Sequence, residues 1–91
     1  MDIDNILQKL RIEELNQMQR DTIDAVLHTD RDVEVLAPTG SGKTLAYLLP
    51  LASRLDAASD EVQAVVIVPS RELALQSHEV FRSMGTGMRS A

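Results

Sequence analysis

The sequence predicts an α/β fold in which parallel strands are flanked by helices. Two apolar runs carry this prediction, VEVLA at residues 33–37 and VQAVVIV at residues 62–68. The second run is rich in β-branched residues, which is typical of a strand buried on both faces of a parallel sheet. Helical periodicity precedes and follows each run, and this alternation favours parallel strands joined by right-handed crossovers. Because the sequence has 91 residues with no repeat or linker, we expect residues 1–91 to form at most one small domain.

Four segments have the 3.6-residue periodicity of amphipathic helices. The first spans residues 2–11, and the second spans residues 17–28. The third covers residues 45–55, where Pro50 predicts a kink because it cannot donate the usual backbone hydrogen bond. The fourth spans residues 71–84.

The composition is that of an acidic globular protein without a targeting signal. The formal net charge is −5, so the average surface repels nucleic-acid phosphates unless a local basic patch outweighs it. There is no cysteine, which excludes disulfides and Cys-based zinc sites. The N-terminus lacks the pattern of a signal peptide, and no apolar run approaches the ~20 residues that a membrane span needs. We therefore expect a cytoplasmic protein that does not contact membranes.

The stretch APTGSGKT, at residues 37–44, lies where the first predicted strand gives way to a helix. At that position several backbone N–H groups point toward one spot, and the helix dipole adds partial positive charge. Gly40 and Gly42 let the backbone approach a phosphate without a side chain in the way. Lys43 can reach the terminal phosphate oxygens, and the hydroxyl of Thr44 can coordinate Mg²⁺. The stretch therefore predicts a site for nucleotide phosphates.

Two further stretches narrow the class of protein. LNQMQ at residues 15–19 and VPSRELALQ at residues 68–76 flank the glycine-rich loop. In order and spacing, the three stretches resemble the Q motif, motif I and motif Ia of DEAD-box helicases, over a region from about Leu7 to Gly87. Motif I alone occurs in many helicases, but SRELALQ at this distance makes the resemblance specific.

The chain is therefore similar to the start of the first RecA-like domain of a DEAD-box ATP-dependent RNA helicase, a P-loop NTPase. The resemblance implies ATP or ADP and Mg²⁺ as ligands, and RNA as a partner of the intact protein.

The resemblance also implies a role for individual residues. The side chain of Gln19 would hydrogen-bond the adenine, although its spacing from Asn16 equally suits a helix-capping box, and both roles can hold at once. Nucleotide binding by motif I falls on Thr39, Gly40, Ser41, Gly42, Lys43 and Thr44. Among these, Lys43 and Thr44 are the candidate catalytic residues, and the Thr44 hydroxyl is the candidate ligand of Mg²⁺. RNA-backbone contacts fall on Pro69, Ser70, Arg71 and Glu72. For Arg71 the alternative is a first-turn charge on an exposed helix face.

The sequence departs from the family pattern at several points. Ala37 replaces the first glycine of motif I, Gln17 replaces the usual proline of the Q motif, and Ser70 replaces the commoner threonine of motif Ia. The upstream aromatic residue that stacks on adenine is absent, which implies weaker adenine binding.

Several parts of a complete helicase are missing from the sequence. No strand ends in Asp-Glu, and the Ser-Ala-Thr motif and the second RecA-like domain are absent. Phosphoryl transfer needs an acidic residue for Mg²⁺, a group that positions water and usually an arginine finger, so we expect these 91 residues alone to be inactive. We expect them to be the N-terminal part of a longer helicase.

In the family, later strands lie between the two strands predicted here. Their unpaired edges therefore predict self-association or incomplete folding of the isolated chain.

Three other functions remain open. They are a DNA helicase of the same superfamily, a non-catalytic P-loop fragment that binds nucleotide or oligomerises, and a small P-loop kinase. The SRELALQ stretch weighs against the kinase.

Overall fold

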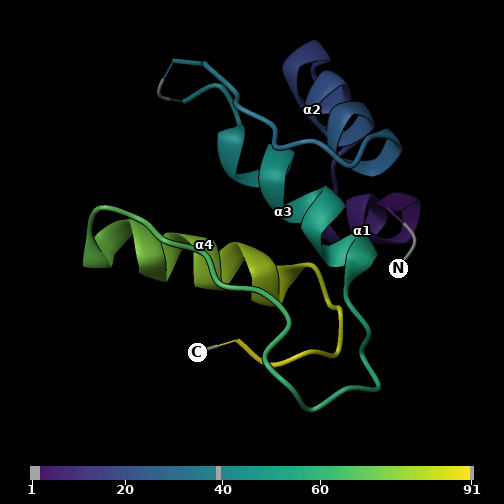
Figure 1. The fold of residues 1–91 in the computed structure, drawn as a ribbon, viewed down its shortest axis with the longest axis vertical. Coiled ribbons are helices and arrows are strands. Elements are labelled where there is room, and N and C mark those ends of the chain that lie inside the picture. The colour runs from purple at the N-terminus through teal and green to yellow at the C-terminus, as the bar shows by residue number, and fades with distance from the viewer. Residues whose placement is uncertain (1–2, 39, 91) are drawn as a thin grey trace.

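A computed structural model describes residues 3–38 and 40–90 of the chain. It contains four helices, which confirm the four predicted from periodicity to within about two residues (Figure 1). Their bounds are α1 Ile3–Leu10, α2 Gln17–His28, α3 Lys43–Arg54 and α4 Arg71–Ser83. No helix in the described part of the chain is both long and apolar enough to cross a membrane.

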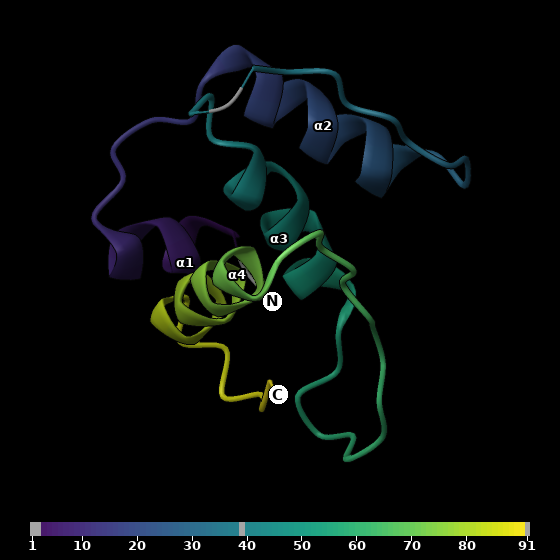
Figure 2. The same cartoon turned by 90° about the vertical axis from the view of Figure 1, so that its left-hand side faces the viewer.

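Helix α3 is central, and the other three helices pack against it (Figures 1 and 2). The buried core joins α1, α3 and the end of α4, and it is largely aliphatic, as a sequence with two aromatic residues requires. Its members are Ile6, Leu48, Leu49, Ala52, Phe81 and Met84. Burial of these side chains stabilises the arrangement, at about 1.5–3 kcal/mol for each large aliphatic side chain that is fully buried.

Polar contacts fix the helices relative to one another at the rim of this core. The Nζ atom of Lys9 on α1 donates to the backbone carbonyl of Gly85, just beyond α4, at 2.8 Å. Between α3 and α4, the hydroxyls of Tyr47 and Ser77 lie 2.8 Å apart. These bonds join segments that are distant in sequence, so they specify how the helices dock rather than how each helix forms.

Pro50 lies inside α3, and its side chain is fully buried. Helix α3 is continuous from Lys43 to Arg54, so the proline does not end it. The kink predicted at Pro50 stays a prediction.

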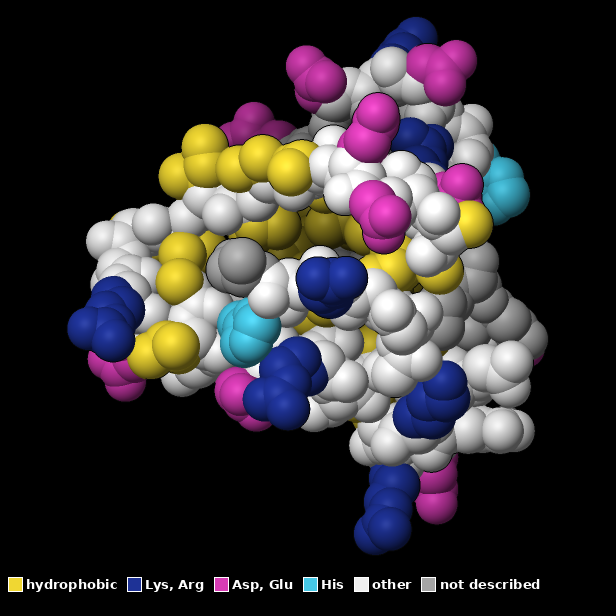
Figure 3. Space-filling model, turned by 90° about the horizontal axis from the view of Figure 1, so that it is seen from below, with side chains coloured by type: hydrophobic (Ala, Val, Ile, Leu, Met, Phe, Trp, Pro, Cys, Tyr) yellow, Lys and Arg dark blue, Asp and Glu magenta, His cyan; other side chains and the backbone are white. Residues whose placement is uncertain are grey.

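The two predicted strands are absent, because residues 33–37 and 62–68 adopt no regular structure and the described residues contain no β-strand. The structure therefore does not show the predicted parallel strands among the residues it describes. A strand needs a neighbour to receive its backbone hydrogen bonds, and the two segments lie apart, residues 33–37 beside α2 and residues 62–68 in the segment that leads to α4 (Figures 1 and 2). Side chains of both runs are left in solvent, with Leu36 89% and Ile67 91% exposed. Hydrophobic side chains are accordingly visible at the surface among charged ones (Figure 3).

Candidate functional site

The glycine-rich loop makes a tight turn into the first residue of α3. Gly40 and Gly42 have φ values of +83° and +90°, in the left-handed region that favours glycine. Within the turn, the backbone N–H and the hydroxyl of Ser41 both donate to the carbonyl of Pro38, at 3.3 and 2.5 Å. Gly42 is the N-cap of α3. The remaining predicted nucleotide-binding residue of this loop, Thr39, lies outside the described residues.

The N-terminus of α3 has the features of an anion site. The first N–H groups of a helix have no acceptor within the helix, and the helix dipole places partial positive charge beside them. The first turn of α3 contains no acidic residue that would neutralise this charge. Lys43, its first residue, is exposed, and Thr44 is partly exposed. The predicted residues from Gly40 to Thr44 are thus brought together at one helix end.

The described residues contain no group of three His, Asp or Glu side chains placed to hold a metal ion. Mg²⁺ typically binds through one or two protein oxygens together with substrate phosphates and water. The start of α3 offers one protein oxygen, the hydroxyl of Thr44, beside an anion site. This arrangement fits a Mg²⁺ ion that binds together with a nucleotide.

The side chain of Gln19 joins the start of α2 to the loop. The predicted capping box is present, because the Asn16 side chain accepts from the Gln19 N–H and the Gln19 Oε1 accepts from the Asn16 N–H, both at 2.9 Å. In addition, the Gln19 Nε2 donates to the carbonyl of Gly42 at 3.1 Å, and Gln19 is only 6% exposed. Both ends of the Gln19 amide are therefore engaged within the protein. Each end keeps one further valence, a second N–H on the Nε2 and a second lone pair on the Oε1, and an adenine would pair through these.

Gly42 is tightly enclosed by the same side chain. A Cβ atom added at Gly42 would lie 2.5 Å from the Gln19 Nε2, closer than non-bonded atoms approach, whereas a Cβ added at Gly40 would have no neighbour within 4 Å. Glycine at position 42 therefore suits both the positive φ and the close contact with α2, and a larger residue there would displace the Gln19 amide.

Sequence reasoning assigned Asn16 to helix capping alone and missed its second contact. The Asn16 Nδ2 donates to the carbonyl of Ser41 at 2.9 Å. The available signal was the residue type, since asparagine differs from the serine, threonine and aspartate found at N-caps in carrying an amide donor.

The predicted RNA-binding residues lie at the start of α4, apart from the loop before α3 (Figures 1 and 2). All four, Pro69, Ser70, Arg71 and Glu72, are exposed. The hydroxyl of Ser70 caps α4 by accepting from the N–H of Leu73 at 3.2 Å, a structural role that sequence reasoning did not assign.

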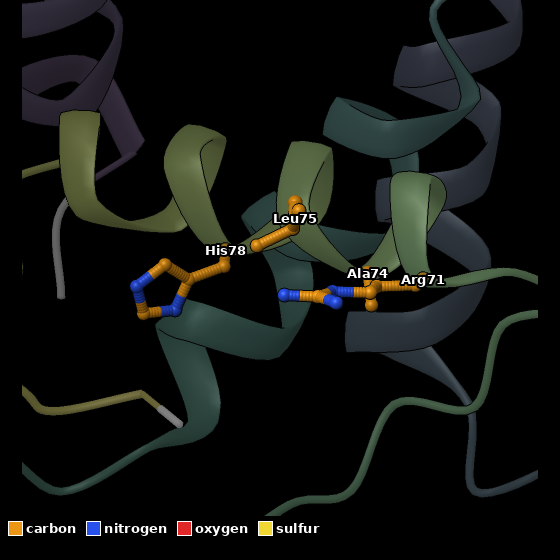
Figure 4. Close-up of a pocket in the computed structure, with 4 residues that line it drawn as sticks. All are labelled: Arg71, Ala74, Leu75 and His78. Carbon is orange, nitrogen blue, oxygen red and sulfur yellow. The ribbon is translucent and has the colours of Figure 1, made fainter.

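Arg71 is exposed in the first turn of α4. With Ala74, Leu75 and His78 it lines an open surface pocket of about 340 Å³ (Figure 4). Exposure of Arg71 agrees with both open readings of this residue, a contact with the RNA backbone and a first-turn surface charge.

Comparison with known proteins identifies the family. The model of the DEAD/DEAH box helicase family matches residues 16–91. The chain is 48% identical over 77 residues to the ATP-dependent RNA helicase DBP10 of Vanderwaltozyma polyspora, a match that covers 80% of this chain and 8% of that protein. It is 40% identical over 80 residues to the DEAD-box ATP-dependent RNA helicase CshC of Bacillus cereus, covering 88% of this chain and 20% of the relative.

A third relative is the mitochondrial ATP-dependent RNA helicase MSS116 of Eremothecium gossypii, 41% identical over 86 residues, with 92% of this chain and 13% of that protein covered. No solved structure matches the chain. The chain thus spans between 8% and 20% of the length of these three relatives. The family match confirms the resemblance in the three motifs, and it implies a P-loop, RecA-like fold, of which the described residues carry helices but no strand. The chain belongs to the DEAD/DEAH box helicase family.

Proposed function

We propose that the chain is the nucleotide-binding N-terminal part of a DEAD-box ATP-dependent RNA helicase, and that residues 40–44 bind the phosphates of ATP or ADP. The observation that carries this proposal is the loop geometry at Gly42. This residue is the N-cap of α3 and has a φ of +90°, and its carbonyl accepts a hydrogen bond from the Gln19 side chain. This geometry presents the open N-terminus of α3 beside Lys43, a combination suited to a polyphosphate.

Each residue of the loop has a distinct part in this proposal. Gly40 and Gly42 allow the backbone to curve around a phosphate, and the N–H groups at the start of α3 donate to its oxygens. The ammonium group of Lys43 balances the charge of the terminal phosphate, and the hydroxyl of Thr44 serves as one ligand of Mg²⁺. When bound, Mg²⁺ supplies further neutralisation of phosphate charge. Gln19 recognises the adenine through the second N–H of its Nε2 and the second lone pair of its Oε1.

The activity of the whole protein belongs to the same proposal. Like the relatives named ATP-dependent RNA helicases, the intact protein would use ATP to remodel RNA, with Pro69, Ser70, Arg71 and Glu72 contacting the RNA backbone. Since none of the apolar runs in these 91 residues ends in Asp-Glu and they include no second RecA-like domain, we expect no hydrolysis by them alone.

The parallel sheet is also part of the proposal. Residues 33–37 and 62–68 expose apolar side chains in the structure, and such segments suit strands that pair with further strands of a longer chain. In their absence the same segments predict self-association, which light scattering measures directly. A monodisperse monomer at high protein concentration would argue against it.

The nucleotide site is tested by melting the chain with and without Mg·ADP. Ligand at about one hundred times its dissociation constant adds about 2.7 kcal/mol of stability, which raises the melting temperature of a domain this size by several degrees. Lys43→Ala should abolish the shift, whereas Arg31→Ala, which removes an exposed positive charge elsewhere, should retain it. Mg·GDP in place of Mg·ADP tests the adenine contact of Gln19. If Mg·ADP raised the melting temperature of the parent chain and of Lys43→Ala by the same amount, the proposal would be contradicted.

A further inference from the structure

We propose that Asn16 is a positioning residue for the phosphate loop, in addition to being the N-cap of α2. Its side chain contacts two elements at once, and the second contact orients the loop that precedes α3. This inference rests on the proposed function, because the loop it orients is the one assigned to nucleotide phosphates.

The two ends of the Asn16 carboxamide have separate partners. Its Oδ1 accepts from the backbone N–H of Gln19 at 2.9 Å, and its Nδ2 donates to the backbone carbonyl of Ser41 at 2.9 Å. Capping needs only the first bond, and serine or aspartate provides it as well as asparagine does. The second bond needs a donor at the position of the Asn16 Nδ2, where serine has no atom and aspartate has a carboxylate oxygen. Asparagine is thus the residue that serves both partners from one N-cap position.

The bond to Ser41 has a consequence for the next residue of the loop. In a planar trans peptide, the C=O of one residue and the N–H of the next point in opposite directions. Holding the Ser41 carbonyl toward α2 therefore turns the N–H of Gly42 away from α2. Gln19 acts in the same way one residue later, since its Nε2 holds the Gly42 carbonyl at 3.1 Å and so turns the N–H of Lys43 away from α2. Two successive peptide groups thus present their donors on the side opposite α2.

A phosphate site requires such donors to be oriented before the ligand arrives. Ser41 lies between two glycines with positive φ, Gly40 and Gly42, which have wide conformational freedom. A free peptide at this place would lose conformational entropy on binding a phosphate, whereas one already held by Asn16 loses less. Asn16 therefore strengthens nucleotide binding without touching the nucleotide.

Variants of Asn16 separate this role from capping. Asn16→Ser keeps a capping oxygen and removes the amide donor, while Asn16→Ala removes both. We expect Asn16→Ser to weaken the binding of Mg·ADP about five-fold by titration calorimetry, from the loss of one hydrogen bond, with a smaller fall in melting temperature than Asn16→Ala causes. Asn16→Ala should show the same loss of affinity and a melting temperature lower by several degrees. Unchanged affinity in Asn16→Ser, where the parent chain binds Mg·ADP, would overturn the role of Asn16.

A second measurement tests, without nucleotide, whether Asn16 orients the loop. Asn16→Asp has the same shape and still caps α2, but it presents a carboxylate oxygen to the Ser41 carbonyl in place of a donor. By ¹⁵N NMR relaxation we expect lower order parameters at Ser41 and Gly42 in this variant, with the hydrogen-exchange protection of the Gln19 amide retained. Unchanged order parameters at both loop residues would refute the inference. If the parent chain binds no Mg·ADP, the proposed function fails for this chain, and the relaxation data still test the contribution of Asn16.

Discussion

Substitution of Gly42 by alanine tests the contact between α2 and the phosphate loop, and Gly40→Ala is its matched control. The two glycines have similar φ values, +90° and +83°, so an alanine at either position meets similar backbone strain. They differ in their surroundings. The new Cβ at position 42 would lie 2.5 Å from the Gln19 Nε2, and the one at position 40 would meet nothing within 4 Å.

The difference between the variants follows from this geometry. Positive φ costs a non-glycine residue about 1–2 kcal/mol, and this cost is common to both. At position 42 the amide of Gln19 must also move, which removes its hydrogen bond to the Gly42 carbonyl and disturbs the capping box of α2. At about 1 kcal/mol for a hydrogen bond and up to a similar amount for a cap, Gly42→Ala should be about 1–2 kcal/mol less stable than Gly40→Ala. For a domain of this length the corresponding difference in melting temperature is about 5–15 °C.

Thermal melting followed by circular dichroism measures this difference. A double-mutant comparison identifies its source, because in a Gln19→Ala background the Cβ at position 42 no longer meets the Nε2. The extra cost of Gly42→Ala over Gly40→Ala should then disappear. Equal melting temperatures for the two single variants would refute the reasoning, as would an extra cost that persists without Gln19.

Three further substitutions test the helical core and its connections. Leu49→Ala removes a fully buried side chain and should destabilise the chain by about 2–5 kcal/mol in urea unfolding, whereas Leu36→Ala, at a residue 89% exposed, should change stability by less than about 0.5 kcal/mol. Ser70→Ala should cost about 1 kcal/mol by removing the N-cap of α4, and Ser70→Asn should restore it; equal stability of both variants would exclude the cap. Tyr47→Phe removes the hydroxyl that meets Ser77 at 2.8 Å and should cost about 1 kcal/mol, and a loss as large in a Ser77→Ala background would show that the two hydroxyls do not interact.

The helices could be predicted from the sequence because their signals are local. The spacing of Asn16 and Gln19 predicted the capping box that the structure contains, and the apolar periodicity within residues 45–55 predicted the face of α3 on which Leu48, Leu49 and Ala52 are buried. A helix satisfies most of its backbone hydrogen bonds within its own segment, so its formation depends little on distant residues.

The strands could not be predicted in the same way. The β-branched run at residues 62–68 indicates a preference for an extended, buried environment, but a strand forms only when another strand accepts its hydrogen bonds. Residues 33–37 lie beside α2, away from residues 62–68, and do not provide that partner (Figures 1 and 2). Ile67 is consequently 91% exposed, where the pattern predicted burial.

The candidate site was predictable in its members but not in its connections. Gly40, Gly42 and Lys43 were identified from residue type and spacing at the start of a helix. The bonds from Asn16 to Ser41 and from Gln19 to Gly42 join positions separated by 25 and 23 residues, and no local pattern encodes them. Only the packing of α2 against α3 brings these side chains to the loop.

The most direct test of the account is a titration of the ¹⁵N-labelled chain with Mg·ADP, followed by two-dimensional NMR. If residues 40–44 bind the phosphates, the backbone amides of Gly42 and Lys43 should show the largest shifts, with smaller changes at Gln19. Absence of shifts in residues 40–44 at saturating Mg·ADP, or shifts confined to the start of α4, would contradict the assignment of this loop as the nucleotide site.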